Sequence, residues 1–243
     1  MSRSIMIASG KGGTGKSTIC VNLGLSLAHA GKKVVLIDLN TGLRCLDILL
    51  SMENVALWNI VDVMKGNCSL DTAVLQTEIE ENLSLLPGTQ EAEPAELTQE
   101  SLYILIDALK SSFDYILIDC PPGIGKIIEM CSECCDEAII VTNSNDTALR
   151  DADALEDKLL RANMYKRSYI LNAVNLELVQ RGVELKLADV DERMRCSLLG
   201  IIQDDTNIKA STNTGVPIVL KRDSYISQNF AKIVDRLETN GEE

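Results

Sequence analysis

Aromatic residues and positive charge are both in short supply in this chain of 243 residues. Phe, Trp and Tyr together make up 3% of the sequence, so the hydrophobic core has to be built from aliphatic side chains, methionine and cysteine. The 36 acidic residues outnumber the 23 Lys and Arg residues, which gives a formal net charge of -13. Because DNA and anionic lipid surfaces are polyanions, this charge argues against non-specific binding to either.

Long apolar runs are missing as well. No stretch approaches the ~18 consecutive apolar residues of a membrane span, and residues 1–8 lack the longer apolar segment and cleavage site of a secretory signal. We therefore expect a cytoplasmic protein whose 8 cysteines are reduced thiols. With a single histidine, His29, the sequence offers no Ser-His-Asp triad and no zinc-type constellation.

Short unbroken runs of Ile, Val and Leu alternate with segments of helical periodicity. Unbroken runs are typical of strands buried on both faces, hence of a parallel sheet. Strands are expected at residues 4–9, 33–38, 83–88, 115–120, 137–142, 168–174 and 198–203, and helices at residues 16–30, 99–110, 127–135, 148–160 and 227–237. This alternation predicts an α/β fold with a doubly wound, mostly parallel sheet and helices on both faces. With no recognisable linker or repeat, residues 1–243 are expected to form one domain.

The glycine-rich stretch between the first expected strand and helix carries the clearest chemical signal. Residues 10–17 read G-K-G-G-T-G-K-S, which matches the phosphate-binding P-loop pattern G-x-x-x-x-G-K-[ST]. Glycines let the backbone point its N–H groups at phosphate oxygens, and the helix N-terminus adds the positive end of a dipole. Lys16 is expected to reach the β- and γ-phosphates, and the Ser17 hydroxyl to bind Mg²⁺. The predicted ATP contacts in this region are Gly10, Lys11, Gly12, Gly13, Thr14, Gly15, Lys16, Ser17 and Thr18.

A second half of the same site is predicted at the stretch Y-I-L-I-D-C-P-P-G, residues 115–123. Asp119 ends an apolar strand, where a carboxylate is costly unless it meets a cation or a hydrogen-bond donor. This is the Walker B pattern, in which the aspartate holds Mg²⁺ directly or through water. Gly123 follows at a place where the chain can sense a γ-phosphate.

A second lysine, Lys11, stands at the start of the loop, although one lysine is enough for an ordinary P-loop. A cation at this position does not easily curl back onto its own nucleotide. We predict that Lys11 points outward at the phosphates of a nucleotide in a second subunit, like an arginine finger supplied in trans. The alternative is a solvent-exposed lysine with no such role.

The loop K-G-G-T-G-K-S is a deviant Walker A motif, and with it the sequence resembles the MinD/ParA family of P-loop ATPases, most closely its MinD branch. The similarity covers nearly the whole chain, and it is also carried by residues 34–47, 118–124, 136–153, 169–174 and 198–219. The resemblance implies an ATPase that uses ATP and Mg²⁺ and forms an ATP-dependent homodimer. It further implies a switch that places the division septum, with the division-inhibitor and activator proteins of the Min system as partners.

Residue roles follow from the same resemblance. Lys11 would cross to the partner's ATP and stabilise charge on it, Lys16 would hold phosphate, and Asp38 with Asn40 would arrange the attacking water. The implied Mg²⁺ ligands are Ser17, Asp38 and Asp119. The adenine would lie beside Asn172, with Gln203, Asp204 and Asp205 close by.

Single residues depart from the family pattern at three positions. Asn40 stands where the family normally has an aspartate that helps to orient the attacking water, and an amide neither accepts a proton nor carries a charge. We therefore expect ATP binding and dimerisation to survive while hydrolysis is slow. Gln203 replaces a usual proline and Cys45 a usual asparagine, and these changes are expected to affect nucleotide affinity or partner choice.

The C-terminal stretch departs as well. Members of the MinD branch usually end in a short basic amphipathic helix that lies on the membrane, whereas residues 238–243 are acidic and poor in apolar side chains. No membrane-targeting helix is recognisable, and peripheral membrane association stays an open alternative. The apolar stripe that precedes this stretch is expected to pack on the sheet; it consists of Ile226, Phe230, Ile233, Val234 and Leu237.

Other interpretations stay open. A non-cycling, ATP-bound scaffold that places another structure, such as a flagellum or pilus, is favoured by Asn40 and by the acidic C-terminal stretch. A ParA-like DNA-partitioning role is disfavoured by the net charge. The pair Cys131 and Cys134, beside Cys135, allows an iron–sulfur site as in the related nitrogenase iron protein, but their spacing favours packing on one helix face.

Overall fold

A single sheet runs through the molecule, and its strands are mostly parallel. The computed structural model describes residues 2–221 and 223–239, and within them the sheet has 8 strands in the order β3-β4-β2-β5-β1-β6-β7-β8. The strands are β1 Arg3–Ala8, β2 Val34–Asp38, β3 Leu75–Gln76, β4 Leu83–Leu86, β5 Tyr115–Asp119, β6 Glu137–Thr142, β7 Arg167–Val174 and β8 Ser197–Gln203. Every strand predicted from the sequence is present. The unpredicted β3 is antiparallel to β4 at one edge, and its two residues are too few to show a pattern.

The predicted site residues lie together at the carboxyl ends of the central strands. β1 lies between β5 and β6, and the later strands extend the sheet on both sides of it, so a crevice is expected just outside these strand ends. The register pairs Ile7 of β1 with Asp119 of β5, and Asp119 with Asp38 of β2. The carboxylates of Asp38 and Asp119 and the start of the glycine-rich loop therefore lie close together at the carboxyl ends of these strands.

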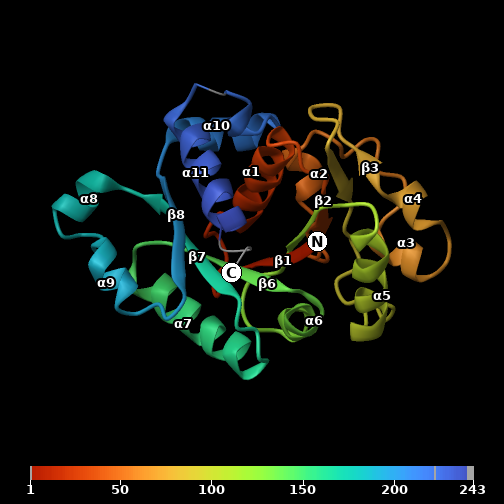
Figure 1. Ribbon diagram of the computed structural model, residues 1–243, viewed down its shortest axis with the longest axis horizontal. Helices are drawn as coiled ribbons and strands as arrows, with labels where there is room; N and C mark the ends of the chain where they lie inside the picture. Colours follow the sequence, from red (N-terminus) through yellow and green to blue (C-terminus); the bar gives the residue numbers. More distant parts are fainter. Residues whose placement is uncertain (1, 222, 240–243) are drawn as a thin grey trace.

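Two hydrophobic cores lie on the two faces of the sheet, because alternate strand residues point to opposite sides. Ile5 and Ile7 belong to the core beneath α1 (Lys16–His29) and α11 (Tyr225–Thr239). Met6 and Ala8 belong to the core beneath α5, α6 and α7, which span Gln99–Lys110, Lys126–Cys134 and Asp146–Arg161. Figure 1 shows these helices in layers on opposite sides of the sheet, so the predicted doubly wound α/β fold is confirmed.

The long helices match their predicted ranges to within two residues at each end. Helix α7 begins two residues earlier than predicted because the Asn145 side chain accepts a hydrogen bond from the Ala148 N–H at 3.0 Å and caps the helix. Short helices that the sequence did not predict are α2 Leu46–Leu49, α3 Ile60–Met64, α4 Leu70–Ala73, α8 Leu176–Gln180, α9 Leu187–Asp191, α10 Thr206–Thr214 and the 3₁₀ turn Ile218–Leu220. Most are too short to repeat an apolar stripe, and α10 buries none of its residues.

The predicted packing of the C-terminal apolar stripe on the sheet is confirmed. Ile226, Phe230, Ile233, Val234 and Leu237 are all buried on α11. The helix can approach β8 closely because Gly200 has no side chain, and a Cβ there would lie 2.3 Å from Ile233 Cγ1. The acidic stretch predicted to follow extends into residues 240–243, which lie outside the described residues.

We expect Gly200→Ala to lower the free energy of unfolding by about 1–3 kcal/mol, because the added methyl group overpacks the contact with Ile233. Urea denaturation followed by circular dichroism measures this change. The double variant Gly200→Ala/Ile233→Ala is the control, since the smaller neighbour makes room for the methyl group. Its destabilisation should be less than the sum of the two single effects; strict additivity would contradict the packing argument.

The cysteines of α6 behave as small core residues, as their spacing predicted. Cys131 and Cys134 are both buried, and Cys135 follows directly after the helix.

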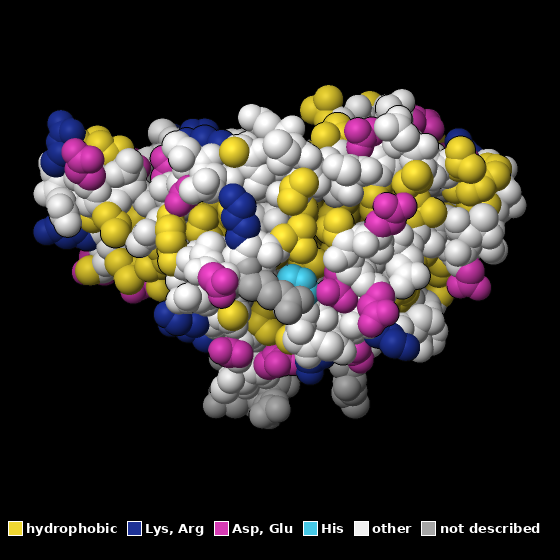
Figure 2. Space-filling model, turned by 90° about the horizontal axis from the view of Figure 1, so that it is seen from above, with side chains coloured by type: hydrophobic (Ala, Val, Ile, Leu, Met, Phe, Trp, Pro, Cys, Tyr) yellow, Lys and Arg dark blue, Asp and Glu magenta, His cyan; other side chains and the backbone are white. Residues whose placement is uncertain are grey.

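None of the helices formed by the described residues combines the length and apolar character needed to cross a bilayer. Figure 2 shows one face of the molecule, on which Lys and Arg side chains are scattered among acidic ones rather than gathered in one patch.

Candidate nucleotide site

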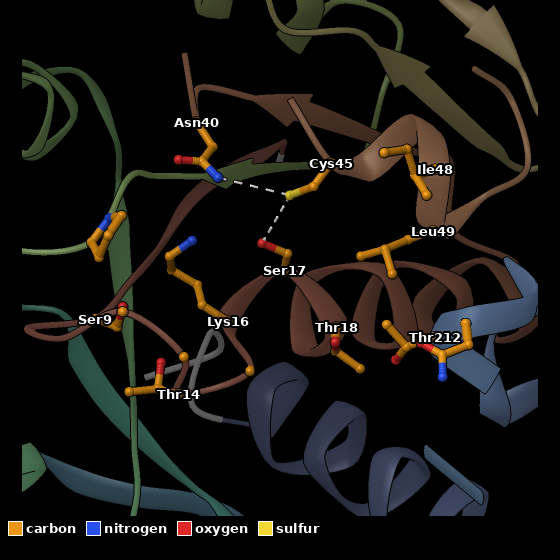
Figure 3. Close-up of a pocket in the computed structure, with 15 residues that line it drawn as sticks. Ser9, Thr14, Lys16, Ser17, Thr18, Asn40, Cys45, Ile48, Leu49 and Thr212 are labelled. Atoms are coloured by element: carbon orange, nitrogen blue, oxygen red, sulfur yellow. Dashed lines mark hydrogen bonds between the residues drawn. The ribbon is translucent and has the colours of Figure 1, made fainter. Parts of the chain in front are cut away.

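The glycine-rich loop borders a cavity of about 580 Å³ beyond the carboxyl end of β1. Four parts of the chain line it: Ser9 and the loop with the first turn of α1, the region from Asn40 to Leu49, Pro122 after β5, and Thr212 with Asn213 of α10. Figure 3 shows Lys16, Ser17 and Thr18 on one side of this cavity and Asn40 and Cys45 across from them. Of the predicted phosphate-binding residues, Gly12 to Thr18 line this cavity, whereas Gly10 and Lys11 do not.

Close tertiary contacts set the path of the loop. Gly10 lies so near α7 that a Cβ there would be 2.0 Å from the backbone oxygen of Asp151. Gly15 takes a φ of 85° directly before α1, a conformation that favours glycine. The Asn172 amide of β7 donates to the Thr14 carbonyl at 2.7 Å. Asn172, which the resemblance placed beside the adenine, thus holds the loop itself.

The N-terminal end of α1 is suited to an anion. Within the described part of the chain, no side chain caps this end, so the N–H groups of the first turn are left for a ligand or water. Thr14 lines the cavity, and its buried Oγ1 has no hydrogen-bond partner among the described residues. This hydroxyl is therefore free to hydrogen-bond a ligand or a water in the cavity.

Lys16 and Asp119 form a buried ion pair. Lys16 Nζ lies 2.7 Å from Asp119 Oδ1, and the two side chains are 7% and 0% exposed. Burial raises the pKa of Asp119, and the charge of Lys16 partly offsets this effect. Burial by itself lowers the pKa of Lys16, but the attraction of Asp119 outweighs it and the net shift is upward. Lys16 is therefore charged at neutral pH.

Ser17 is the hydroxyl beside this pair. It donates to Asp119 Oδ2 at 2.6 Å, and it lines the cavity from the first turn of α1. Gly123, which follows the Asp119 strand, donates its N–H to the Ser9 carbonyl at 2.8 Å. Hydrogen bonds thus join Asp119 to Ser17 at the end of the loop, and Gly123 to Ser9 just before the loop.

Asp38 anchors the segment of residues 39–45, which we call the β2–α2 loop. Its Oδ1 accepts the Asn40 N–H at 2.9 Å, and its Oδ2 accepts the N–H groups of Cys45 and Leu46 at 2.8 and 3.0 Å. Burial raises the pKa of this carboxyl, and the backbone hydrogen bonds act in the opposite direction. Asp38 therefore sets the position of Asn40 and Cys45 relative to Ser17.

Asn40 and Cys45 face each other across the β2–α2 loop. The Asn40 Nδ2 donates to Cys45 Sγ at 3.8 Å, and the Cys45 thiol donates to Ser17 Oγ at 3.3 Å. Both residues line the cavity, and Figure 3 shows the chain of contacts from Asn40 through Cys45 to Ser17. Burial raises the pKa of the Cys45 thiol, and Asp38 adds to the effect.

Lys11 is directed away from the cavity of its own chain. Its side chain is exposed, and Nζ lies 3.2 Å from the Thr147 hydroxyl at the start of α7. Ser9 and Gly12 to Thr18 line the cavity, but Lys11 does not. The lysine of the first loop position is therefore separate from Lys16 in space as well as in sequence.

A second cavity of about 290 Å³ adjoins the first, since Gly13 to Gly15, Thr18, Thr212 and Asn213 line both. It is also lined by residues that the resemblance placed near the adenine: Asn172, Gln203, Asp204 and Asp205. Helix α10 closes its other side with Ile208, Lys209 and Thr212. Sequence reasoning did not predict any contribution of α10, because this helix shows no apolar stripe.

The residues present fit a nucleotide with Mg²⁺. Within the described residues, no group of three His, Cys, Asp or Glu side chains is arranged to hold a metal ion alone. A P-loop does not need one, because Mg²⁺ there is held by the loop hydroxyl, phosphate oxygens and water, with an acidic residue nearby. Ser17 beside Asp119 provides this combination.

A strand, a glycine-rich loop and a helix, with a lysine paired to a buried aspartate on the neighbouring strand, define a P-loop nucleotide-binding protein. A family model described as an AAA domain matches residues 2–170. The septum site-determining protein MinD of Synechocystis sp. is 40% identical over 98% of this chain and 90% of its own length. The chain belongs to the MinD family of P-loop ATPases, a family that uses ATP and Mg²⁺.

Solved structures agree with this assignment. The MinC:MinD cell division protein complex of Aquifex aeolicus matches with a TM-score of 0.90 and 34% identity, over 98% of this chain and 96% of that chain. The MinD protein of Pyrococcus horikoshii, complexed with Mg-ADP, matches with a TM-score of 0.87 and 30% identity, over 99% and 98%. The resemblance drawn from the sequence is confirmed over nearly the whole chain.

Proposed function

We propose that this chain is an ATP-dependent dimerising switch that helps to place the division septum. The observation that carries the proposal is the position of Lys11. It is exposed and directed away from its own cavity, while Gly12 to Ser17 of the same loop line that cavity. A lysine so placed is available to the phosphates of a second subunit, and without those phosphates two lysine-bearing faces would repel each other.

ATP would be held by the loop and by the first turn of α1. The backbone of Gly10 to Gly15 and the N–H groups at the helix start would bind the phosphates, with Lys16 beside them. Mg²⁺, when bound at Ser17 with Asp119 and Asp38 nearby, would neutralise phosphate charge. The adenine would occupy the second cavity, between the β8 end at Gln203 to Asp205 and helix α10.

Hydrolysis would be slow because of Asn40. Its side chain lines the cavity, where it can hold a water by hydrogen bonds. An amide does not take the proton of that water, so the proton has to pass to a phosphate oxygen or to solvent. The ATP-bound dimer is therefore expected to be long-lived.

The partners of the switch are proposed from its relatives. One relative of known structure is a MinC:MinD complex, so a division inhibitor of this kind and an activator of hydrolysis are the partners to test. We place the protein in the cytoplasm as one domain of residues 1–243, with reversible attachment to a membrane as an alternative. The net charge of -13 disfavours a DNA-partitioning role.

A second candidate function is a non-cycling scaffold that stays ATP-bound and places another structure, such as a flagellum or pilus. The observation that favours it is Asn40 in the position that faces the nucleotide cavity. The rate of turnover and binding to liposomes in ATP separate the two functions. A cycling switch hydrolyses ATP once an activator is added, whereas a scaffold does not.

Light scattering tests the dimerisation. We expect the solution mass to double with a slowly hydrolysed ATP analogue but not with ADP, and Lys11→Ala to stay a monomer in both. Lys33→Ala, which removes an exposed lysine before β2, is the matched control and should dimerise like the wild type. Nucleotide binding of Lys11→Ala is measured alongside. A dimer of Lys11→Ala that forms as readily as the wild type would refute the role of Lys11.

A further inference from the structure

Cys45 brings a sulfur atom to the place where the metal ion of the nucleotide is expected. Its Sγ lies 3.3 Å from Ser17 Oγ and 4.0 Å from Asp119 Oδ2. Ser17 Oγ and Asp119 Oδ2 are in turn 2.6 Å apart. The sulfur, the hydroxyl and the carboxylate oxygen thus form a small triangle at the end of the cavity nearest β2 and β5.

The separation of the sulfur and the hydroxyl matches that of two neighbouring ligands on one ion. A thiolate and an oxygen bound at about 2.3 and 2.1 Å, with an angle between about 90° and 110°, lie roughly 3.1–3.6 Å apart. The observed distance of 3.3 Å falls in this range. An ion bound to Ser17 Oγ on the side that faces Cys45 would therefore lie within bonding distance of both atoms.

Two hydrogen bonds within the β2–α2 loop and its anchor fix the position of the Cys45 sulfur. Asp38 accepts the N–H of Cys45 at 2.8 Å, and Asn40 donates its amide to Sγ at 3.8 Å. Independently, the buried and unpartnered Oγ1 of Thr14 marks the same cavity as one that receives a ligand. The sulfur is thus fixed at the edge of a site that is prepared for a phosphate and its counter-ion.

We infer that Cys45 is a further metal ligand of the nucleotide site and raises the affinity of this chain for thiophilic divalent ions, such as Co²⁺, Zn²⁺ or Cd²⁺, relative to Mg²⁺. The inference rests on the proposed binding of a metal–ATP complex. The bound ion displaces the thiol proton to solvent, and the sulfur then donates an electron pair to it. Mg²⁺ selects oxygen ligands and gains little from the sulfur, whereas the other ions favour it.

Cobalt spectroscopy tests the inference with a readout that does not depend on turnover. The protein is titrated with Co²⁺ and a slowly hydrolysed ATP analogue, and the sulfur-to-cobalt charge-transfer band in the near ultraviolet is recorded. The band should appear with the wild type only when nucleotide is present, and it should be absent in Cys45→Ser. Cys68→Ser is the matched control, because Cys68 is also half-buried but lies outside the cavity, and it should keep the band.

Equilibrium dialysis gives the second readout. The ratio of the affinities for Cd²⁺·ATP and Mg²⁺·ATP should fall by more than about tenfold in Cys45→Asn, which carries the residue usual in the family. Nucleotide that binds with Co²⁺ to the wild type without the band, or a band that persists in Cys45→Ser, would overturn the inference alone. Failure to bind ATP with any of these ions would overturn the proposed function, and the inference with it.

Discussion

Replacing Lys16 by alanine is expected to weaken ATP binding by a factor between about thirty and a few thousand. The change removes a buried charge that would hydrogen-bond the phosphates, and such losses cost about 2–5 kcal/mol of binding free energy. Lys16 is 7% exposed, so water does not readily replace its ammonium group. Isothermal titration with ATP and Mg²⁺ measures the affinity directly.

The same variant is also expected to be less stable without nucleotide. Asp119 would keep its burial but lose its cation, and breaking a buried ion pair in this way costs about 3–5 kcal/mol. Its pKa, already raised by burial, would rise further, so the folded state would hold a proton that the unfolded state releases. The loss of stability should therefore be largest at neutral pH and shrink as the pH falls through the raised folded pKa toward the unfolded value of about 3.9.

A double variant separates binding from folding. Lys16→Ala/Asp119→Asn removes the unpaired charge and should recover stability at neutral pH, as measured by urea denaturation, while ATP binding stays weak. If Lys16→Ala bound ATP as tightly as the wild type, the assignment of Lys16 to the phosphates would be wrong. If the double variant were no more stable than the single one, the ion pair would not be the source of the effect.

Replacing Asn40 by aspartate is expected to raise the rate of ATP hydrolysis about a hundredfold or more. A carboxylate can accept the proton of the attacking water, and general-base catalysis of this kind contributes about 10²–10⁴ in rate. The substitution hardly changes the size of the side chain, and the Asn40 N–H can still donate to Asp38, as it does in the wild type. Phosphate release under saturating ATP and Mg²⁺ measures the rate.

Asn40→Gln is the matched control, because it keeps an amide and gains no base. Its rate should stay low, and all three proteins should still bind ATP. Rapid turnover by the wild type that Lys16→Ala abolishes would show that Asn40 does not slow the enzyme. A rate of Asn40→Asp equal to that of the wild type would leave the non-cycling scaffold as the better account of this site.

The prediction of the fold from the sequence succeeded where the signal was local. Strand runs such as 115–119 are unbroken and apolar, and the helix that follows the P-loop starts at Lys16 as predicted, because glycine and periodicity act within a few residues. The sequence also indicated that the Asp119 carboxylate, at the end of a buried strand, needs a cation or a hydrogen-bond donor. That Lys16 is this cation is seen only in the structure.

Other parts of the site depend on contacts between distant segments. The Asp38 carboxylate anchors the β2–α2 loop, the Asn172 amide holds the Thr14 carbonyl, and α10 borders both cavities. The sequence pattern does not predict these roles, because each depends on which strands are neighbours in the sheet and on where a polar helix packs.

Cys45 shows the difference between what the sequence predicts and what only the folded structure determines. In the sequence it is one substitution near a switch, and neither its partners nor its distance from Ser17 can be deduced. Local chemistry, which depends on residue type and spacing along the chain, was enough to identify a phosphate loop, and the resemblance of these motifs to a known family indicated an ATPase. The placement of a sulfur beside the Ser17 hydroxyl follows from strand register and from the loop that Asp38 fastens, and these are properties of the packed sheet.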